Sequence, residues 1–200
     1  TGALNAKASA PDAMNASILA YPAETAGAGN QPLEPRLAAD GTKEFDITAA
    51  IIDWEVAPGR IVQAWAYNGM VPGPMIRVEV GDRVRVNVSN DLPMGTDVHF
   101  HGIGLPNAMD GVAPLTQPLI EPGDTFTYEF VAETPAVAMY HAHHHAQIQV
   151  PNGLFGVFIV GEVELPRGRT VSGIPIPADL ELAAELPMVL NDAGVIGYSL

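Results

Sequence analysis

Cysteine is absent from this sequence of 200 residues. Without cysteine these residues form no disulfide, and no copper site built on a thiolate can lie within them. The absence says little about the redox compartment, because a chain without thiols is compatible with an oxidising or a reducing one.

Basic residues are scarce, with 9 Lys and Arg against 23 Asp and Glu, which gives a formal net charge of -14. Such a charge repels nucleic acid and anionic membrane surfaces, so we expect neither as a partner. Long apolar runs are missing as well, and a membrane-spanning helix would need about 18 such residues. The sequence opens on Thr1 without a basic segment followed by an apolar one, and we therefore expect a signal peptide to be absent or already removed.

Apolar residues make up 48% of the chain, which is ample for a packed core. Several segments alternate apolar and polar residues between Gly and Pro turns, a pattern that predicts strands with one buried face. They are residues 45–52, 61–67, 75–80, 83–88, 97–101, 124–131, 136–143 and 153–160, the last apolar on both faces. About eight such strands predict an all-β fold, a sandwich of two sheets, in which 75–80 and 83–88 form a hairpin across Gly81-Asp82.

The two ends of the chain differ in composition from this middle part. Residues 1–43 are rich in Ala, Gly, Pro and Asn without a sustained period, and we interpret them as an irregular arm. After Gly161 the composition becomes that of a linker, with one short helix expected at 178–185 and strand character again from Pro187.

All six histidines fall in two short clusters, His99-Phe-His101 and His141-Ala-His143-His144-His145. On extended strands, residues two apart share a face, so His99 pairs with His101 and His141 with His143, while Phe100 and Ala142 point the other way. Such a pair is separated by roughly 6.5 to 7 Å, whereas a metal to imidazole bond is about 2 Å, so each pair suits two neighbouring ions better than one.

If the two strands are neighbours in a sheet, the four imidazoles lie on one patch. They would then supply half of the ligands of a cluster of two or three ions. Imidazole ligands with no cysteine favour copper or zinc, and the spacing does not choose between them. His144 and His145 can equally be surface residues, and His145 can be an outer ligand if the strand stays regular. Gln147 and Gln149 are expected at the strand surface or at an interface.

The motifs are ordered as His99-Phe-His101-Gly, Met109-Asp110-Gly111, Tyr140-His141-Ala142-His143 and Gly153-Leu-Phe-Gly156. In order and spacing, residues 44–161 resemble the first cupredoxin domain of multicopper oxidases of the laccase-like, two-domain type. The resemblance implies a Greek-key β-sandwich of the cupredoxin type. It divides the chain into the arm (1–43), a cupredoxin-like domain with copper ligands (44–162), and a linker with the start of a second cupredoxin domain (163–200).

By this resemblance, His99 would bind a type 2 copper, and His101, His141 and His143 would bind the type 3 pair. Asp110 matches the acidic residue of the family that assists proton delivery during oxygen reduction. An aspartate before a glycine is also a common turn residue, and the residues alone leave that alternative open.

The implied function is a copper-dependent oxidase that couples one-electron oxidation of a substrate to reduction of dioxygen to water. The chain would supply four of the eight histidines of a trinuclear copper cluster. The partner would be a second cupredoxin domain carrying type 1 copper, in a homo-oligomer, with a trimer as one form. The resemblance also implies a secreted or periplasmic location.

Two other functions stay open at this point. The chain can be a non-catalytic copper- or zinc-binding cupredoxin module, which the missing cysteine permits. A copper nitrite reductase-like protein is less compatible, because Ala142 stands where that group has a cysteine after the histidine.

Overall fold

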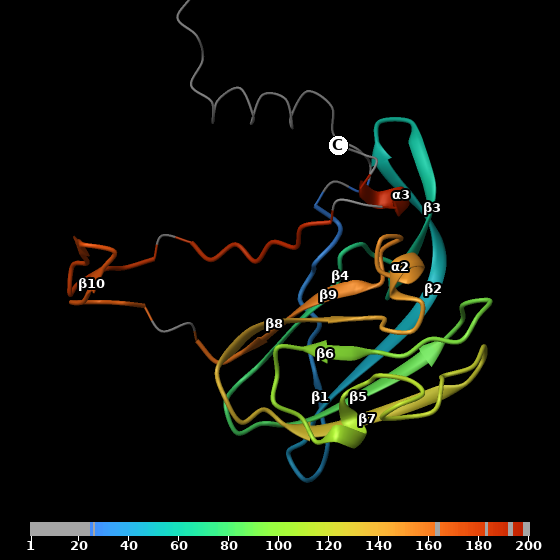
Figure 1. Ribbon diagram of the computed structural model, residues 1–200, viewed down its shortest axis with the longest axis horizontal. Coiled ribbons are helices and arrows are strands. Elements are labelled where there is room, and N and C mark those ends of the chain that lie inside the picture. The colour runs from blue at the N-terminus through green and yellow to red at the C-terminus, as the bar shows by residue number, and fades with distance from the viewer. Residues whose placement is uncertain (1–24, 26, 163–164, 183, 192–193, 198–200) are drawn as a thin grey trace, which may run out of the picture.

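Two β-sheets packed face to face form the body of the computed structural model, which describes residues 25, 27–162, 165–182, 184–191 and 194–197 (Figure 1). The first sheet contains β1 (Arg36–Leu37), β2 (Lys43–Ala57), β3 (Arg60–Tyr67), β5 (Arg83–Asn90) and β7 (Thr125–Val131). The second sheet, in spatial order, contains β4 (Gly73–Val78), β9 (Phe155–Val160), β8 (Ala136–His141) and β6 (His99–His101). The predicted all-β sandwich is confirmed.

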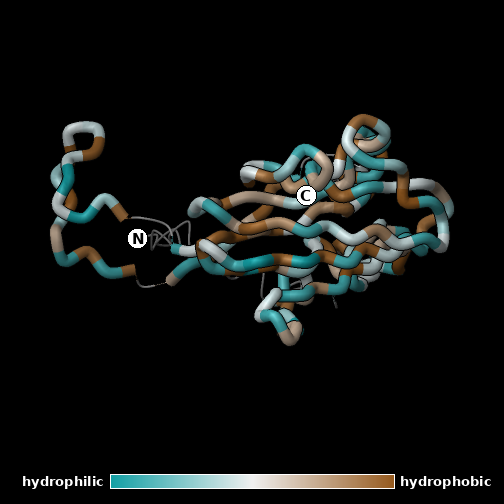
Figure 2. The backbone as a smooth tube through the Cα atoms, turned by 90° about the horizontal axis from the view of Figure 1, so that it is seen from below, coloured by the Kyte–Doolittle hydropathy of each residue, from teal (hydrophilic) through white to brown (hydrophobic). Residues whose placement is uncertain are grey.

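The core lies between the sheets because alternate residues of each strand point into it, and the same alternation of hydrophobic and hydrophilic positions is visible along the chain in Figure 2. On β5, for example, Val84, Val86 and Val88 are buried. All residues of β9 are buried, as its apolar sequence predicts, because this strand lies inside its sheet between β4 and β8.

The predicted hairpin of residues 75–80 and 83–88 is wrong. β4 pairs in parallel with β9, while β5 pairs with β2 and β7 in the other sheet. Gly81 and Asp82 therefore carry the chain across the core from one sheet to the other. Each strand still needs one apolar face, so alternation alone does not distinguish two paired strands from two strands that face each other across a core.

Part of the N-terminal arm pairs with the sandwich, whereas residues 1–24 and 26 lie outside the described residues. Met75 on β4 donates its N–H to the carbonyl of Gln31 and accepts the N–H of Leu33, both at 2.9 Å. Gly29 lies directly against the backbone at Val71, where no side chain would fit. Residues 29–33 thus extend the second sheet beside β4.

The C-terminal part differs from the prediction. None of residues 178–182 and 184–185 is helical, and residues 187–191 form no strand. Every second position from Leu180 to Leu190 is apolar, with Ala183 and Val189 apolar in addition, and this spacing is not the repeat of three to four residues that an amphipathic helix needs. Two short strands, β10 (Thr170–Val171) and β11 (Ile174–Pro175), pair with each other and project from the sandwich (Figure 1).

Three short helical turns complete the described structure: η1 (Asn107–Met109), α2 (Ala146–Gln149) and α3 (Gly194–Gly197). The segment before α3 returns to the body, where Val189 and Ile196 pack against the cluster of Trp54, Val71 and Phe155. No helix among the described residues is long and apolar enough to cross a membrane.

Candidate metal centre

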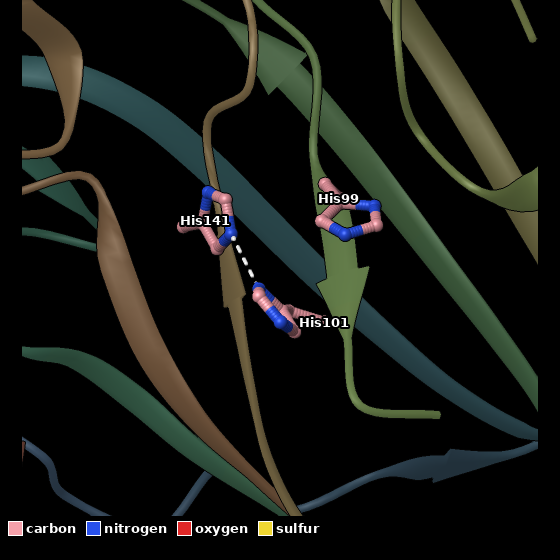
Figure 3. A group of neighbouring side chains, drawn as sticks. All are labelled: His99, His101 and His141. Atoms are coloured by element: carbon pink, nitrogen blue, oxygen red, sulfur yellow. Dashed lines mark hydrogen bonds between the residues drawn. The ribbon is translucent and has the colours of Figure 1, made fainter. Parts of the chain in front are cut away.

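Strand pairing brings the two histidine motifs together. β6 and β8 are antiparallel neighbours, and their register places His99 directly opposite His141 and His101 opposite Met139. Side chains directly opposite each other on paired strands stand on the same face of the sheet. His99, His101 and His141 therefore share one face at the edge of the second sheet (Figure 3).

The residues between the histidines anchor that edge to the core. Phe100 is 1% exposed, and its ring contacts those of Tyr128, Phe130 and Phe158 at centroid distances of 5.2, 5.2 and 5.8 Å. Tyr140 pairs with Phe100 in register, is fully buried, and donates its hydroxyl to the carbonyl of Pro74 at 2.6 Å. Because alternate side chains are fixed in the core, the histidines between them are held on the outer face.

The imidazoles are close enough to serve neighbouring metal ions. The ring of His99 lies 5.4 Å from that of His101 and 5.3 Å from that of His141, measured between centroids. One ring nitrogen from each of these three residues lies within 4.8 Å of the other two. Nε2 of His141 lies 3.5 Å from Nδ1 of His101 (Figure 3).

His143 joins the cluster from outside the strand. β8 ends at His141, earlier than the predicted end at 143, and the ring of His143 lies 5.5 Å from that of His99. The strand does not stay regular as far as His145, which has a left-handed φ of 48° and precedes α2, so the condition for His145 to be an outer ligand on that strand is not met. The rings of His144 and His145 contact each other, with centroids 4.2 Å apart.

Two hydrogen bonds fix the orientation of the inner imidazoles. Nδ1 of His99 lies 2.6 Å from the backbone carbonyl of Asp110, and Nδ1 of His141 lies 2.9 Å from the carbonyl of Ala142. A carbonyl only accepts, so Nδ1 of each ring carries the proton and Nε2 keeps its free lone pair. Burial, together with the nearby imidazoles, lowers the pKa of His141, which favours the neutral ring that a metal requires.

Asp110 lies beside His99 because of the glycine that follows it. Gly111 has a φ of 77°, and a side chain there would overlap the carbonyl of Val98 on the chain leading into β6. This close approach brings the backbone of Asp110 to His99 and leaves its carboxylate partly exposed, with Oδ1 3.6 Å from Nδ1 of His99. The carboxylate of Asp110 therefore lies beside Nδ1 of His99 and is partly exposed to solvent.

Two buried polar residues near the motifs were missed or misread in the sequence. Gln149 was expected at the surface, but it is fully buried, accepts the hydroxyl of Thr96 at 2.6 Å and donates to the carbonyl of Gly95 at 3.0 Å. Asp97 is also fully buried and binds backbone N–H groups beside the second motif. The residues around Asp97, with Gly95 and Thr96 before it and Val98 and His99 after it, give no signal that it is buried.

An apolar groove of about 500 Å³ borders the cluster on the side of His101. Its walls come from β8, through Val137 and Met139, and from the C-terminal segment, through Met188 and Leu190. Val137, Met188 and Leu190 are 68%, 81% and 92% exposed, values that are high for large apolar side chains.

Comparison with known proteins shows the family to which the chain is similar. A family model described as multicopper oxidase matches residues 49–164. Copper resistance protein A of Pseudomonas syringae pv. tomato is 37% identical over 126 residues, covering 63% of this chain and 20% of that protein. Multicopper oxidase MmcO of Mycobacterium tuberculosis is 43% identical over 108 residues, covering 54% of this chain and 21% of that protein.

Solved structures share the fold. A crystal structure of a multi-copper oxidase from Pseudomonas thermotolerans superimposes with a TM-score of 0.60 at 38% identity, covering 64% of this chain and 32% of that one. The chain thus spans about a fifth of the length of the curated relatives it matches. The sandwich described above is of the cupredoxin type found in these structures.

Proposed function

The chain belongs to the multicopper oxidase family, and from this premise we propose that it carries half of the copper cluster of a laccase-like oxidase. Copper bound here would supply the electron transfer that couples one-electron oxidation of a substrate to reduction of dioxygen to water. The observation that carries the proposal is the convergence of His99, His101, His141 and His143 from two motifs on one patch.

The donor set fits copper. Imidazole nitrogens are ligands that copper prefers, and neutral rings with free lone pairs are what metal binding requires. Two nitrogens bound at about 2 Å to one ion with a near-tetrahedral angle lie about 3.3 Å apart. Nδ1 of His101 and Nε2 of His141, at 3.5 Å, already have this spacing, so these two rings need little movement to share one ion.

We assign the ligands by family motif and local geometry together. His99 would bind a type 2 copper through Nε2, because its Nδ1 donates to the carbonyl of Asp110. His101, His141 and His143 would bind the type 3 pair. The hydrogen bond from each Nδ1 of His99 and His141 orients the ring and makes its other nitrogen a better ligand.

Asp110 would deliver protons during oxygen reduction. Its carboxylate is 38% exposed and Oδ1 faces His99 at 3.6 Å, so one side of the group meets solvent and the other meets the cluster. An aspartate in this place can take a proton from water and hold it at Oδ1 beside the site.

Four imidazoles do not complete a trinuclear cluster, so the remaining ligands would come from a second cupredoxin domain that also carries type 1 copper. These 200 residues contain no cysteine for that site. The exposed apolar groove beside His101 supports a protein surface packing next to the cluster. We propose that this surface belongs to a homo-oligomer, with a trimer as one form, and that the protein is secreted or periplasmic.

The test replaces His101 or His143 with Ala and uses His145→Ala as the matched control. His145 lies in the same segment as His143, but its ring contacts that of His144. Copper content and the absorption of the paired copper should be lost in the first two variants and kept in the control. Unchanged metal content and spectra in His101→Ala and His143→Ala would show that the ligand assignment is wrong.

A non-catalytic copper- or zinc-binding module is the second candidate, because this chain holds imidazole ligands without a type 1 site. The two functions differ in dioxygen consumption. Copper-loaded protein that includes the second domain should consume dioxygen with an electron donor if it is an oxidase, and should not if it is a storage or binding module.

A further inference from the structure

Asp97 is a buried carboxylate two residues before His99. Its side chain is fully buried, and Oδ1 accepts the backbone N–H groups of His143 at 2.7 Å and of His144 at 2.8 Å. Oδ2 accepts the N–H of Ala113 at 2.9 Å. Among the described residues no side-chain cation pairs with it, so three backbone donors alone compensate its charge.

This arrangement requires a carboxylate. An ionised aspartate only accepts hydrogen bonds, and both of its oxygens are used here. An asparagine has one acceptor oxygen, and its NH₂ group would face the N–H of either Ala113 or His143. Burial raises the pKa of Tyr128, and the charge of Asp97 adds to that effect, as expected for an anion that no cation neutralises.

The three N–H donors, those of Ala113, His143 and His144, belong to segments outside the β-strands, where no hydrogen bond of a sheet fixes the backbone. β8 ends at His141, so no ladder hydrogen bond sets the direction of the chain at His143. Ala113 follows the loop in which the carbonyl of Asp110 meets His99. Asp97 therefore ties together the strand of the first motif, the turn of the second motif and the Asp110 loop.

We propose that Asp97 is the positioning residue that holds His143 and the Asp110 loop in place around the metal centre. The inference rests on the proposed function, since it assigns Asp97 to the copper ligands named above. Its buried negative charge also favours cations bound at the neighbouring imidazoles. The same tie explains why His143 lies near the ring of His99 although it is outside the strand.

The first test compares copper affinity in Asp97→Asn, Asp97→Ala and Asn90→Ala. Asn90 is the matched control: it is also fully buried and also makes three hydrogen bonds, to Leu92, Met94 and Ile120. Loss of a residue that orients metal ligands typically weakens metal binding about 10- to 100-fold. We expect that loss, with altered copper spectra, in both Asp97 variants, and affinity within about threefold of the unaltered chain in Asn90→Ala despite its lower melting temperature.

The second test uses metal-free protein and does not depend on a difference in overall stability between the variants. Hydrogen exchange of the metal-free, unaltered chain should show protected amides at Ala113, His143 and His144, and Asp97→Asn should exchange them faster while the amides of β5 stay protected. This measurement decides the case if Asp97→Ala does not fold. Unprotected amides at these three residues in the unaltered chain would overturn the inference.

The outcomes also separate this inference from the proposed function. If the unaltered chain and both Asp97 variants bind copper equally well, only the positioning role is wrong. If protein that includes the second domain binds no copper, the proposed function is wrong and the inference falls with it.

Discussion

Replacing Gly111 with alanine tests how strictly the backbone near Asp110 is required. Gly111 has a φ of 77°, and an added methyl group would overlap the carbonyl of Val98 and lie 2.8 Å from the amide nitrogen of His99. Real contacts of this kind are not shorter than 3.0 Å. Either the Asp110 loop or the chain leading into β6 must therefore move, and both contribute backbone to the candidate site.

The magnitude has two parts. A left-handed alanine costs about 1 to 2 kcal/mol relative to glycine. Overlap with packed backbone adds about 1 to 3 kcal/mol, as in other over-packed sites. The sum, about 2 to 5 kcal/mol, would lower the melting temperature by roughly 4 to 20 °C, at about 2 to 4 °C per kcal/mol.

Gly69→Ala is the matched control, because Gly69 has a φ of 73° and nothing within 4 Å of the added methyl group. It isolates the cost of the left-handed backbone. Thermal unfolding and copper titration of both variants give the comparison: Gly111→Ala should be less stable than Gly69→Ala and should bind copper more weakly, because the carbonyl of Asp110 moves from His99. Equal stability and equal copper binding in the two variants would refute the reasoning.

Three further predictions concern protons and assembly. Asp110→Asn should keep its copper but reduce dioxygen about 10²- to 10⁴-fold more slowly, most at high pH; an aspartate that only forms a turn would show unchanged oxygen consumption. The pKa of His141 lies below its ordinary value of 6.5, so the unfolded chain takes up the proton first, and the metal-free fold should keep its stability above about pH 6.5 and lose it as pH falls toward the lowered pKa. Denaturant titrations at several pH values should give different slopes of unfolding free energy against pH for the unaltered chain and for His141→Gln. Parallel slopes would contradict this prediction. Sedimentation of the native protein should show an oligomer with the cluster at an interface, whereas a 21.0 kDa monomer with full oxidase activity would exclude that assembly.

The sequence located most strands and the four histidines that the fold brings together, because both depend on local pattern. Alternation requires only that each strand bury one face, and the spacing of His99 and His101 places both on the other face of β6. Phe100 and Ala142 were predicted to point away from the histidines, and both are buried. The pairing of β6 with β8 was expected from chemistry, since two histidine motifs are useful only side by side.

Local pattern failed where the chain changes sheet or leaves a strand. Strands β4 and β5 have the same alternation as a hairpin, yet they lie in different sheets, because their partners β9 and β2 are distant in the sequence. The end of β8 at His141 was missed because His143, His144 and His145 carry no turn residue. Gln149 was misplaced for the same reason, since its burial follows from the turn into α2.

By itself the sequence determined the chemistry available to this protein, which is imidazole ligands without a thiolate. It also determined that these imidazoles lie on the face of their strands opposite to the core, because apolar residues alternate with them. Only the tertiary structure decided how these ligands are held, because hydrogen bonds between distant segments cannot be read from spacing. Asp97 shows this most directly: nothing in the neighbouring sequence marks its carboxylate, and only folding brings it to the N–H groups of Ala113, His143 and His144. A buried anion must find donors wherever the fold provides them, and here the fold provides them beside the candidate metal centre.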